Sequence, residues 1–181
     1  IATKLALGYA LNEVVNAITQ ETSANFEPAL DYVALKFPRW DLQKFQQVST
    51  QLGTEMKSVG EVMSLGRSFE EVLQKAIRML DVGLKGFVCN DLKFDDLDKE
   101  LSQPTDKRIF AIAVALHNGY SINKIHQLTK ITPWFLHKMK NIVVTELKLK
   151  QKSLLEIDNV LLKEAKQNGF SDQQIADLIH S

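Results

Sequence analysis

The feature that most constrains the fold is a short pattern that occurs twice in the second half of the sequence. NGYSINKIHQL at 118–128 and NGFSDQQIADL at 168–178 share Asn-Gly, an aromatic residue, a serine, an isoleucine and a leucine at matching positions. Glycine commonly ends a helix in the left-handed conformation, and serine commonly caps the start of the next helix. Each copy therefore predicts a helix that ends, turns and is followed by a short capped helix.

The sequence from Ser68 onward predicts helices throughout. Ser68 and Glu71 match a capping box, and apolar residues with helical spacing follow them. This pattern predicts a helix that is ended by Gly83 and Gly86. The charged stretch 91–107 is typical of a surface linker or a short helix. Further helices are predicted from Pro104 to Gly119, over 121–129, from a Thr132 cap with Pro133 at the first position to about residue 152, and over 159–169.

The first 67 residues have a different character. Apolar residues over 1–18 have helical spacing, with a break at Gly8, and a polar loop follows. The stretch 30–40 is rich in β-branched and aromatic residues, which predicts a strand that stops near Pro38. The stretch MKSVGEVMSLG that ends at Gly66 is either a strand or irregular. We therefore expect a mainly α chain, in which a helical domain over 68–181 follows a small α+β segment over 1–67.

Composition limits the classes of function. Hydrophobic residues make up 45% and charged residues 24%, as in a globular protein. The formal net charge is zero, which argues against a nucleic-acid partner. No apolar run is long enough to predict a membrane span. A single cysteine, Cys89, suits a reducing compartment. Because the sequence lacks an initiator Met and opens within an expected helix, we expect it to be part of a longer chain.

Residues 119–142 invite comparison with a DNA-binding helix-turn-helix motif. A recognition helix needs polar side chains at its start to reach base edges, but the second helix here starts with Trp134, Phe135 and Leu136 after its Thr132 cap and Pro133. This apolar start favours a packing motif over a DNA reader. We interpret Trp134 and Phe135 as buried anchors or interface residues.

Residues with catalytic or metal-binding chemistry form no known constellation. His117, His126, His137 and His180 lack the spacing of a helical metal site, which favours surface or capping roles. Cys89 has no base nearby in the sequence, so a buried thiol is expected. GEVMSLG lacks the spacing and the ending of a phosphate loop. The sequence therefore predicts no catalytic residue, no metal site and no cofactor-binding site.

Four blocks of sequence point to a known family. KLALGYALNEVVNAIT at 4–19, NFEPALDYVALKFPRWDLQKF at 25–45, EMKSVGEVMSLGRSFEEVLQKAIRML at 55–80 and ITPWFLHKM at 131–139 occur in this order. Together they resemble the large subunit of carbamoyl phosphate synthetase over essentially the whole chain. PTDKRIFAIA and WFLHKMK are most similar to the eukaryotic multifunctional pyrimidine-pathway form.

The resemblance implies a fold and an activity. In this family two ATP-grasp halves are separated by a helical oligomerization domain, so residues 1–67 would be the tail of the carboxyphosphate-synthesising half and 68–181 the oligomerization domain. The whole enzyme makes carbamoyl phosphate from bicarbonate, ammonia from glutamine and two ATP, with Mg²⁺ and K⁺. The family's nucleotide and metal ligands lie outside these residues.

The resemblance also implies partners and a compartment. The partners would be the rest of the synthetase chain, its glutamine amidotransferase unit and further copies in a homo-oligomer, without nucleic acid or membrane. The compartment would be the cytoplasm, with the mitochondrion as the alternative. Two other functions stay open from the sequence: a stand-alone helical interaction module without enzymatic role, and, third, a helix-turn-helix DNA binder.

Three residues match positions that line the carbamate passage in the family: Leu30, Met56 and Glu61. Leu30 could instead be a strand residue in the core, and Met56 a core filler. Glu61 would be a polar wall group or a solvent-facing carboxylate. Since a carboxylate repels an anionic intermediate, we expect Glu61 to be paired with a cation, hydrogen-bonded or protonated, with Lys57 as the nearby candidate partner.

Overall fold

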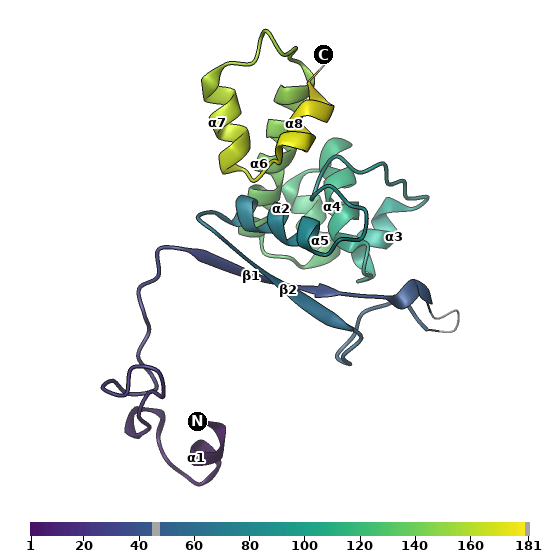
Figure 1. Ribbon diagram of the computed structural model, residues 1–181. Coiled ribbons are helices and arrows are strands. Elements are labelled where there is room, and N and C mark those ends of the chain that lie inside the picture. The colour runs from purple at the N-terminus through teal and green to yellow at the C-terminus, as the bar shows by residue number, and fades with distance from the viewer. Residues whose placement is uncertain (45–47, 180–181) are drawn as a thin grey trace. The chain divides into compact units, whose positions relative to one another are not determined.

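The computed structural model describes residues 1–44 and 48–179 and divides the chain into two compact units, Ile1–Asp31 and Tyr32–Ser181 (Figure 1). The first unit holds short helical turns, and the second combines a two-stranded sheet with most of the helices. These elements confirm the mainly α class with a small α+β segment. None of the helices in the described residues is both long and apolar enough to cross a membrane.

The first unit contains much less helix than predicted. Helix α1 covers Ala2–Ala6, the 3-10 turn η1 covers Leu11–Glu13, and Gly8 between them has φ +95°. Ile18 is 92% exposed. A helix is stabilised mainly by burying its apolar face, and these side chains bury little within the unit. The Asn16 side chain instead accepts hydrogen bonds from the backbone N–H groups of Ile18 and Thr19, which compete with helix formation.

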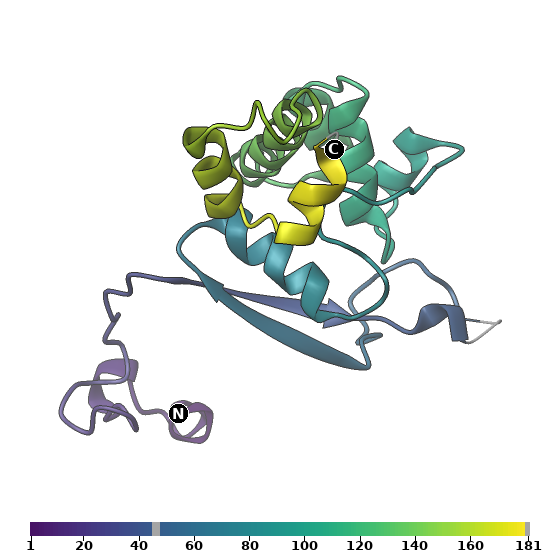
Figure 2. The same cartoon turned by 45° about the horizontal axis from the view of Figure 1, so that its top comes forward.

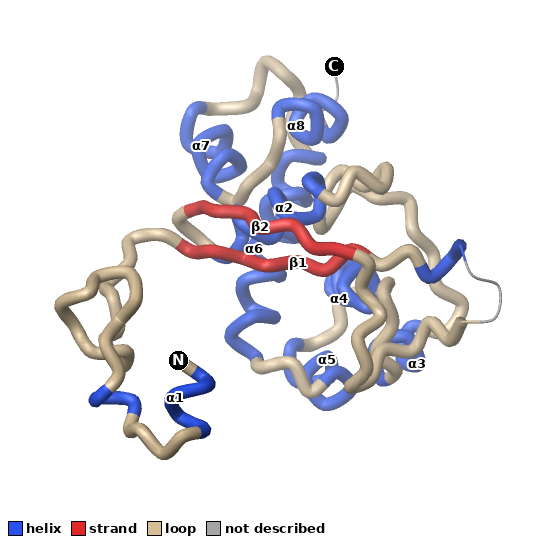
Figure 3. Tube along the Cα trace, turned by 60° about the horizontal axis from the view of Figure 1, so that its bottom comes forward, coloured by secondary structure: helices blue, strands red, loops and turns tan. Residues whose placement is uncertain are grey.

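The sheet of the second unit is an antiparallel hairpin (Figure 3). Strand β1 covers Val33–Arg39 and strand β2 covers Gly60–Gly66, with Val33 opposite Gly66 and Arg39 opposite Gly60. The prediction of a strand ending near Pro38 is confirmed, because β1 ends one residue later. The 3-10 turn η2, Leu42–Lys44, follows β1. Of the two interpretations of MKSVGEVMSLG, the strand is correct.

One face of the hairpin packs on helix α2, Phe69–Met79 (Figure 2). Ser64 on this face is buried, and its hydroxyl donates a hydrogen bond of 2.7 Å to the carbonyl of Val72. Arg39 donates from Nη1 to the carbonyl of Leu80, at 3.0 Å. The hairpin and the first helix of the helical region are therefore held together by polar bonds as well as by apolar packing.

The start of α2 follows the prediction in part. The Ser68 hydroxyl accepts the backbone N–H of Glu71 at 3.2 Å, as an N-cap should. The reciprocal bond of a capping box is not formed, because the Glu71 carboxylate accepts the N–H of Arg67 instead. The predicted end at Gly83 and Gly86 is wrong: α2 ends at Met79, and Asp81 already has φ 51°.

The remaining helices lie close to their predicted positions. The short-helix interpretation of 91–107 is correct, because a helix of 6 residues forms there with Asp96 as its N-cap. The helices are α3 Leu97–Ser102, α4 Arg108–His117, α5 Ile122–Thr129, α6 Pro133–Lys150, α7 Asn159–Gln167 and α8 Asp172–Leu178.

The two copies of the repeated pattern form the same junction. Gly119 and Gly169 have φ 77° and 82°. The N–H of the aromatic residue after each glycine bonds a carbonyl five residues back, at 2.9 Å in the first junction and 3.0 Å in the second. Each following serine then caps the next helix. These bonds are those of a Schellman motif followed by an N-cap, so the predicted repeat is confirmed.

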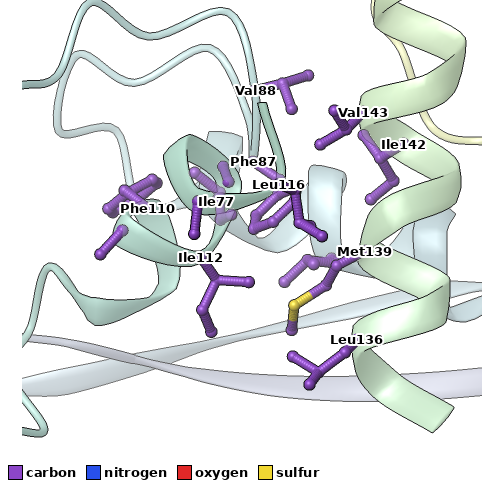
Figure 4. Close-up of a cluster of buried hydrophobic side chains, with 14 of the residues drawn as sticks. Ile77, Phe87, Val88, Phe110, Ile112, Leu116, Leu136, Met139, Ile142 and Val143 are labelled. Carbon is purple, nitrogen blue, oxygen red and sulfur yellow. The ribbon is translucent and has the colours of Figure 1, made fainter. Parts of the chain in front are cut away.

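The hydrophobic core lies where α4 meets α6 and α2 (Figure 4). Ile112 of α4 and Ile142 of α6 are fully buried and lie in this cluster with Ile77 of α2. Phe87, in the loop after α2, closes the same cluster. This core fixes the relative positions of the helices that carry the candidate site residues.

Candidate functional site

Glu61 lies on the open face of the hairpin, away from α2. Its Oε1 is 2.7 Å from Nζ of Lys36, and both side chains are more than half exposed. The two residues lie on neighbouring strands, because Glu61 is opposite Pro38 and Lys36 is opposite Met63. Residues offset in this way share one sheet face, so their side chains can meet diagonally. Glu61 is therefore paired with a cation, as expected.

The predicted cation partner of Glu61 is wrong. Lys57 donates to the carbonyls of Ser49 and Gln51 and pairs with Glu55 at 3.1 Å, and its side chain is only 13% exposed. Lys57 thus holds together the loop before β2. Lys36 was missed because its proximity to Glu61 depends on the strand register, which sequence distance does not reveal.

The core interpretations of Leu30 and Met56 are wrong. Met56 is 89% exposed in the loop before β2, and Leu30 is 59% exposed and precedes β1 rather than lying in it. Neither side chain packs against the described part of its own unit closely enough to serve as core. Both are free to contact other parts of a larger protein.

Trp134 and Phe135 form an aromatic cluster with Phe69 at the start of α2. Ring centroids are 5.9 Å apart for Phe69 and Trp134, 5.2 Å for Phe69 and Phe135, and 4.9 Å for Trp134 and Phe135. Nζ of Lys138 lies 5.5 Å from the Trp134 ring centroid. We call Phe69, Trp134 and Phe135 the aromatic cluster.

The aromatic cluster reaches the surface. Trp134 is 54% exposed and Phe135 is 40% exposed, so the interpretation of these two residues as buried anchors is wrong. Three adjoining aromatic rings at a surface are typical of a contact site, because large exposed apolar patches are uncommon on monomers. Sequence reasoning missed Phe69, whose position directly after the Ser68 cap was the available signal.

A buried carboxylate lies between α4 and α6. Glu146 is 1% exposed, with its two oxygens 2.6 Å from Nε2 of His117 and 3.0 Å from Nζ of Lys150. Burial pushes the pKa of Glu146 upward, but its contacts with His117 and Lys150 outweigh this and hold the pKa below its usual range. No sequence signal singles out Glu146, since its burial depends on how α4 packs on α6.

Cys89 lines the same cavity of about 400 Å³ as Glu146. Burial, and next the negative charge of Glu146, raise the pKa of the Cys89 thiol to about 12. Since the thiolate is the reactive form, Cys89 is a poor nucleophile. The expectation of a buried thiol holds only in part, because Cys89 is partly buried.

The three histidines that the structure describes do not come together. His117 contacts Glu146, His126 Nδ1 is 2.7 Å from the carbonyl of Ile131, and His137 is exposed on α6. His180 lies outside the described residues. Within 1–44 and 48–179, no group of three or more His, Cys, Asp or Glu side chains is placed to hold a metal ion.

Comparison with known proteins gives the family. The family model of the carbamoyl-phosphate synthetase large chain, oligomerisation domain, matches residues 61–181. A mitochondrial arginine-specific large chain of Schizosaccharomyces pombe is 52% identical over 98% of the chain, and the multifunctional protein CAD of Squalus acanthias is 53% identical over 100%. The large chain of Archaeoglobus fulgidus is 47% identical over 100%.

The matches differ greatly in length from this chain. The chain spans 15% of the Schizosaccharomyces protein, 8% of the Squalus protein and 18% of the Archaeoglobus protein. Both its helical part and the hairpin that packs on it lie within these alignments, which cover nearly all of its residues. The chain therefore belongs to the family of carbamoyl-phosphate synthetase large chains, and its residues 61–181 correspond to the oligomerisation domain of that family.

Proposed function

We propose that these residues act within a glutamine-dependent carbamoyl phosphate synthetase, which forms carbamoyl phosphate from bicarbonate, ammonia released from glutamine and two ATP. Their role in it is to mediate oligomerization and to link the two synthetase halves. The match of residues 61–181 to the family's oligomerisation domain is the observation that carries this proposal. The exposed aromatic cluster supports it, because it offers a surface suited to a partner.

The proposal assigns cofactors and partners to the whole enzyme rather than to these residues. ATP, Mg²⁺ and K⁺ would bind in the two synthetase halves, and the glutamine amidotransferase unit would supply ammonia. Relatives include both a mitochondrial arginine-specific chain and multifunctional proteins at similar identity. We place the protein in the multifunctional pyrimidine-pathway class and in the cytoplasm, with the mitochondrion as the alternative.

The hairpin supports a division in which residues 1–67 end an ATP-grasp half and 68–181 form the oligomerization domain. A two-stranded sheet is rarely stable alone, and α2 covers only one of its two faces. The open face of the hairpin carries Met63, 59% exposed, and Leu65, 51% exposed, beside Glu61. An apolar sheet face of this kind suits docking against the rest of a synthetase half, even though the opposite face packs on α2.

We also propose that Leu30, Met56 and Glu61 line the passage that carries carbamate between the two halves. Exposure of all three side chains supports this, since a residue buried in its own unit could not face a passage. A carboxylate in the wall would repel an anionic intermediate. The pairing of Glu61 with Lys36 offsets this repulsion, because the ammonium group carries the opposite charge. Carbamate decomposes in water, so the passage must shield it from bulk solvent.

Replacement of Glu61 by alanine in the full-length synthetase tests the passage. Bicarbonate-dependent ATP hydrolysis should persist, because the first phosphorylation does not need Glu61. Carbamoyl phosphate formed per ATP consumed should fall, because the shortened side chain leaves a gap in the wall through which carbamate leaks before the second phosphorylation. ATP hydrolysis and carbamoyl phosphate formation are measured in the same assay.

Glu55→Ala is the matched control for this experiment. Glu55 is also an exposed carboxylate paired with a lysine, at 3.1 Å from Lys57, but it does not lie on the open face of the hairpin. Its removal should leave the ratio of carbamoyl phosphate to ATP unchanged. Equal ratios for wild type, Glu61→Ala and Glu55→Ala would remove Glu61 from the passage.

A further inference from the structure

A basic cleft lies beside the aromatic cluster. Four cationic side chains from three parts of the chain line it: Arg67 before α2, Lys138 on α6, and Lys163 and Lys166 on α7. Its volume is about 530 Å³. The positive end of the α2 dipole points into the same region, because Ser68 at the helix start is also part of the lining. We call these four residues the basic cleft.

The carboxylates in the cleft are already used within the unit. Glu71 pairs with Lys75 and accepts the N–H of Arg67. Glu70 is buried, and its Oε1 accepts the Asn141 side-chain amide at 2.9 Å and lies 3.4 Å from Lys138. These contacts engage both carboxylates and also Lys138, so Arg67, Lys163 and Lys166 remain as the exposed cations of the cleft.

Three cations of the cleft, Arg67, Lys163 and Lys166, are largely free to bind a partner. Arg67 and Lys163 form no salt bridge with any residue that the structure describes. Lys166 pairs only with Asp172, whose side chain is 96% exposed, and exposed pairs of this kind are weak. The cleft therefore presents uncompensated positive charge.

The neighbouring aromatic cluster indicates that the ligand of the cleft is a protein. Lys138 belongs to the cleft and also lies over the Trp134 ring, so the two surfaces are continuous. Aromatic anchors surrounded by charged groups are typical of protein interfaces. A small oxyanion would use the cations and leave the aromatic rings exposed.

This chain itself carries an acidic surface of the required kind. Residues 91–100 contain five acidic residues and two lysines. Asp91, Asp95 and Asp96 are exposed and form no salt bridge within 1–44 and 48–179. The segment leads into α3, which lies at the opposite end of the second unit from α7 in Figures 1 and 3. The acidic segment therefore cannot reach the basic cleft of its own copy.

We propose that the basic cleft of one copy binds the acidic segment 91–100 of a second copy. The four cations of the cleft and the five acidic residues of the segment have opposite charges, so the two surfaces complement each other. Such a contact can form twice in a two-fold dimer, or repeat from copy to copy around a closed ring. This contact rests on the proposed role in oligomerization, because it names the surfaces that carry it.

Charge reversal in the full-length synthetase tests the contact. One variant carries Lys163→Glu and Lys166→Glu, and the other carries Asp91→Lys and Asp95→Lys. Each alone should weaken self-association about tenfold or more in sedimentation velocity, because like charges then face each other. An equimolar mixture of the two variants should regain association, since each reversed cleft meets a reversed segment.

Lys107→Glu with Lys140→Glu is the matched control, because both lysines are exposed and lie outside the cleft and the segment. It changes net charge equally and should leave association unchanged. Near-native circular dichroism of every variant excludes misfolding as the cause. If neither reversal weakens association, or if the mixture fails to restore it, the proposed contact is wrong although oligomerization stands. A strictly monomeric wild type would instead refute the proposed role in oligomerization.

Discussion

At the scale of single residues, Glu146 stands out because it is a carboxylate buried between two helices. A buried carboxylate is costly unless it is paired, and Glu146 is paired on both oxygens, with His117 from the end of α4 and Lys150 one turn further along α6. The three side chains thus join two helices at a point where apolar packing is interrupted.

The low pKa of Glu146 predicts a pH-dependent contribution to stability. Its folded-state pKa lies below the ordinary 4.5, so the ionised form is favoured by folding. This contribution is complete above about pH 4.5 and is lost as the pH falls through the folded-state pKa. Glu146→Gln should therefore lower the free energy of unfolding by about 2 kcal/mol near pH 7, and the difference from wild type should shrink toward pH 3.

Urea unfolding at several pH values measures this difference. Glu164→Gln is the control, because Glu164 is also paired with a lysine of α6, at 2.8 Å, but its side chain is 37% exposed. Its replacement should cost less than about 1 kcal/mol. A Glu146→Gln difference that stays constant from pH 7 to pH 3 would show that the ionised pair contributes nothing.

At the scale of elements, the two copies of the junction have the same local structure but different neighbours. Their backbone angles and hydrogen bonds are nearly the same. A methyl group added at Gly119 would meet no atom within 4 Å, whereas at Gly169 it would lie 2.8 Å from Cα of Glu71 and 3.0 Å from Cβ of Gln74. The second junction therefore packs closely on α2, and the first is open.

Alanine at each glycine separates backbone strain from packing. Gly119→Ala should cost about 1 kcal/mol, because a left-handed conformation is unfavourable for alanine. Gly169→Ala carries the same strain and should cost about 1–3 kcal/mol more, because the backbone of α2 would have to move. Chemical denaturation of both variants measures the two costs. Equal losses would mean that the contact of Gly169 with α2 does not constrain the fold.

At the scale of the whole molecule, three exposed surfaces indicate function more clearly than the core does. The open face of the hairpin, the aromatic cluster and the basic cleft all lie outside the cluster of buried residues around α4. Each is a surface that a compact unit would not need for its own stability. Together they indicate a unit built for contacts with other chains or other parts of a longer chain.

Trp134→Ala in the full-length synthetase should weaken self-association at least about tenfold, because exposed aromatic anchors dominate interface energy. The thermal midpoint should change little, since Trp134 is already 54% exposed. Sedimentation velocity measures the effect, with Leu155→Ala as a control at an apolar residue that is 97% exposed and lies between α6 and α7. Equal association of wild type and both variants would contradict an interface role for the aromatic cluster.

What the sequence determined by itself is local. The repeated junction, the Ser68 cap, Pro133 at the start of α6 and the strand ending near Pro38 were all predictable, because each depends on hydrogen bonds and backbone preferences within a few residues. The resemblance in ordered blocks gave the family for the same reason: residues can be matched along a chain without knowing their neighbours in space.

The tertiary structure decided which side chains meet and which stay exposed. Lys36 rather than Lys57 pairs with Glu61 because the register of β1 and β2 sets the pairing. Apolar spacing over 1–18 did not produce a long helix, since an apolar stripe stabilises a helix only when another surface covers it. Burial depends on contacts between residues far apart in sequence, and these exist only once the chain has folded.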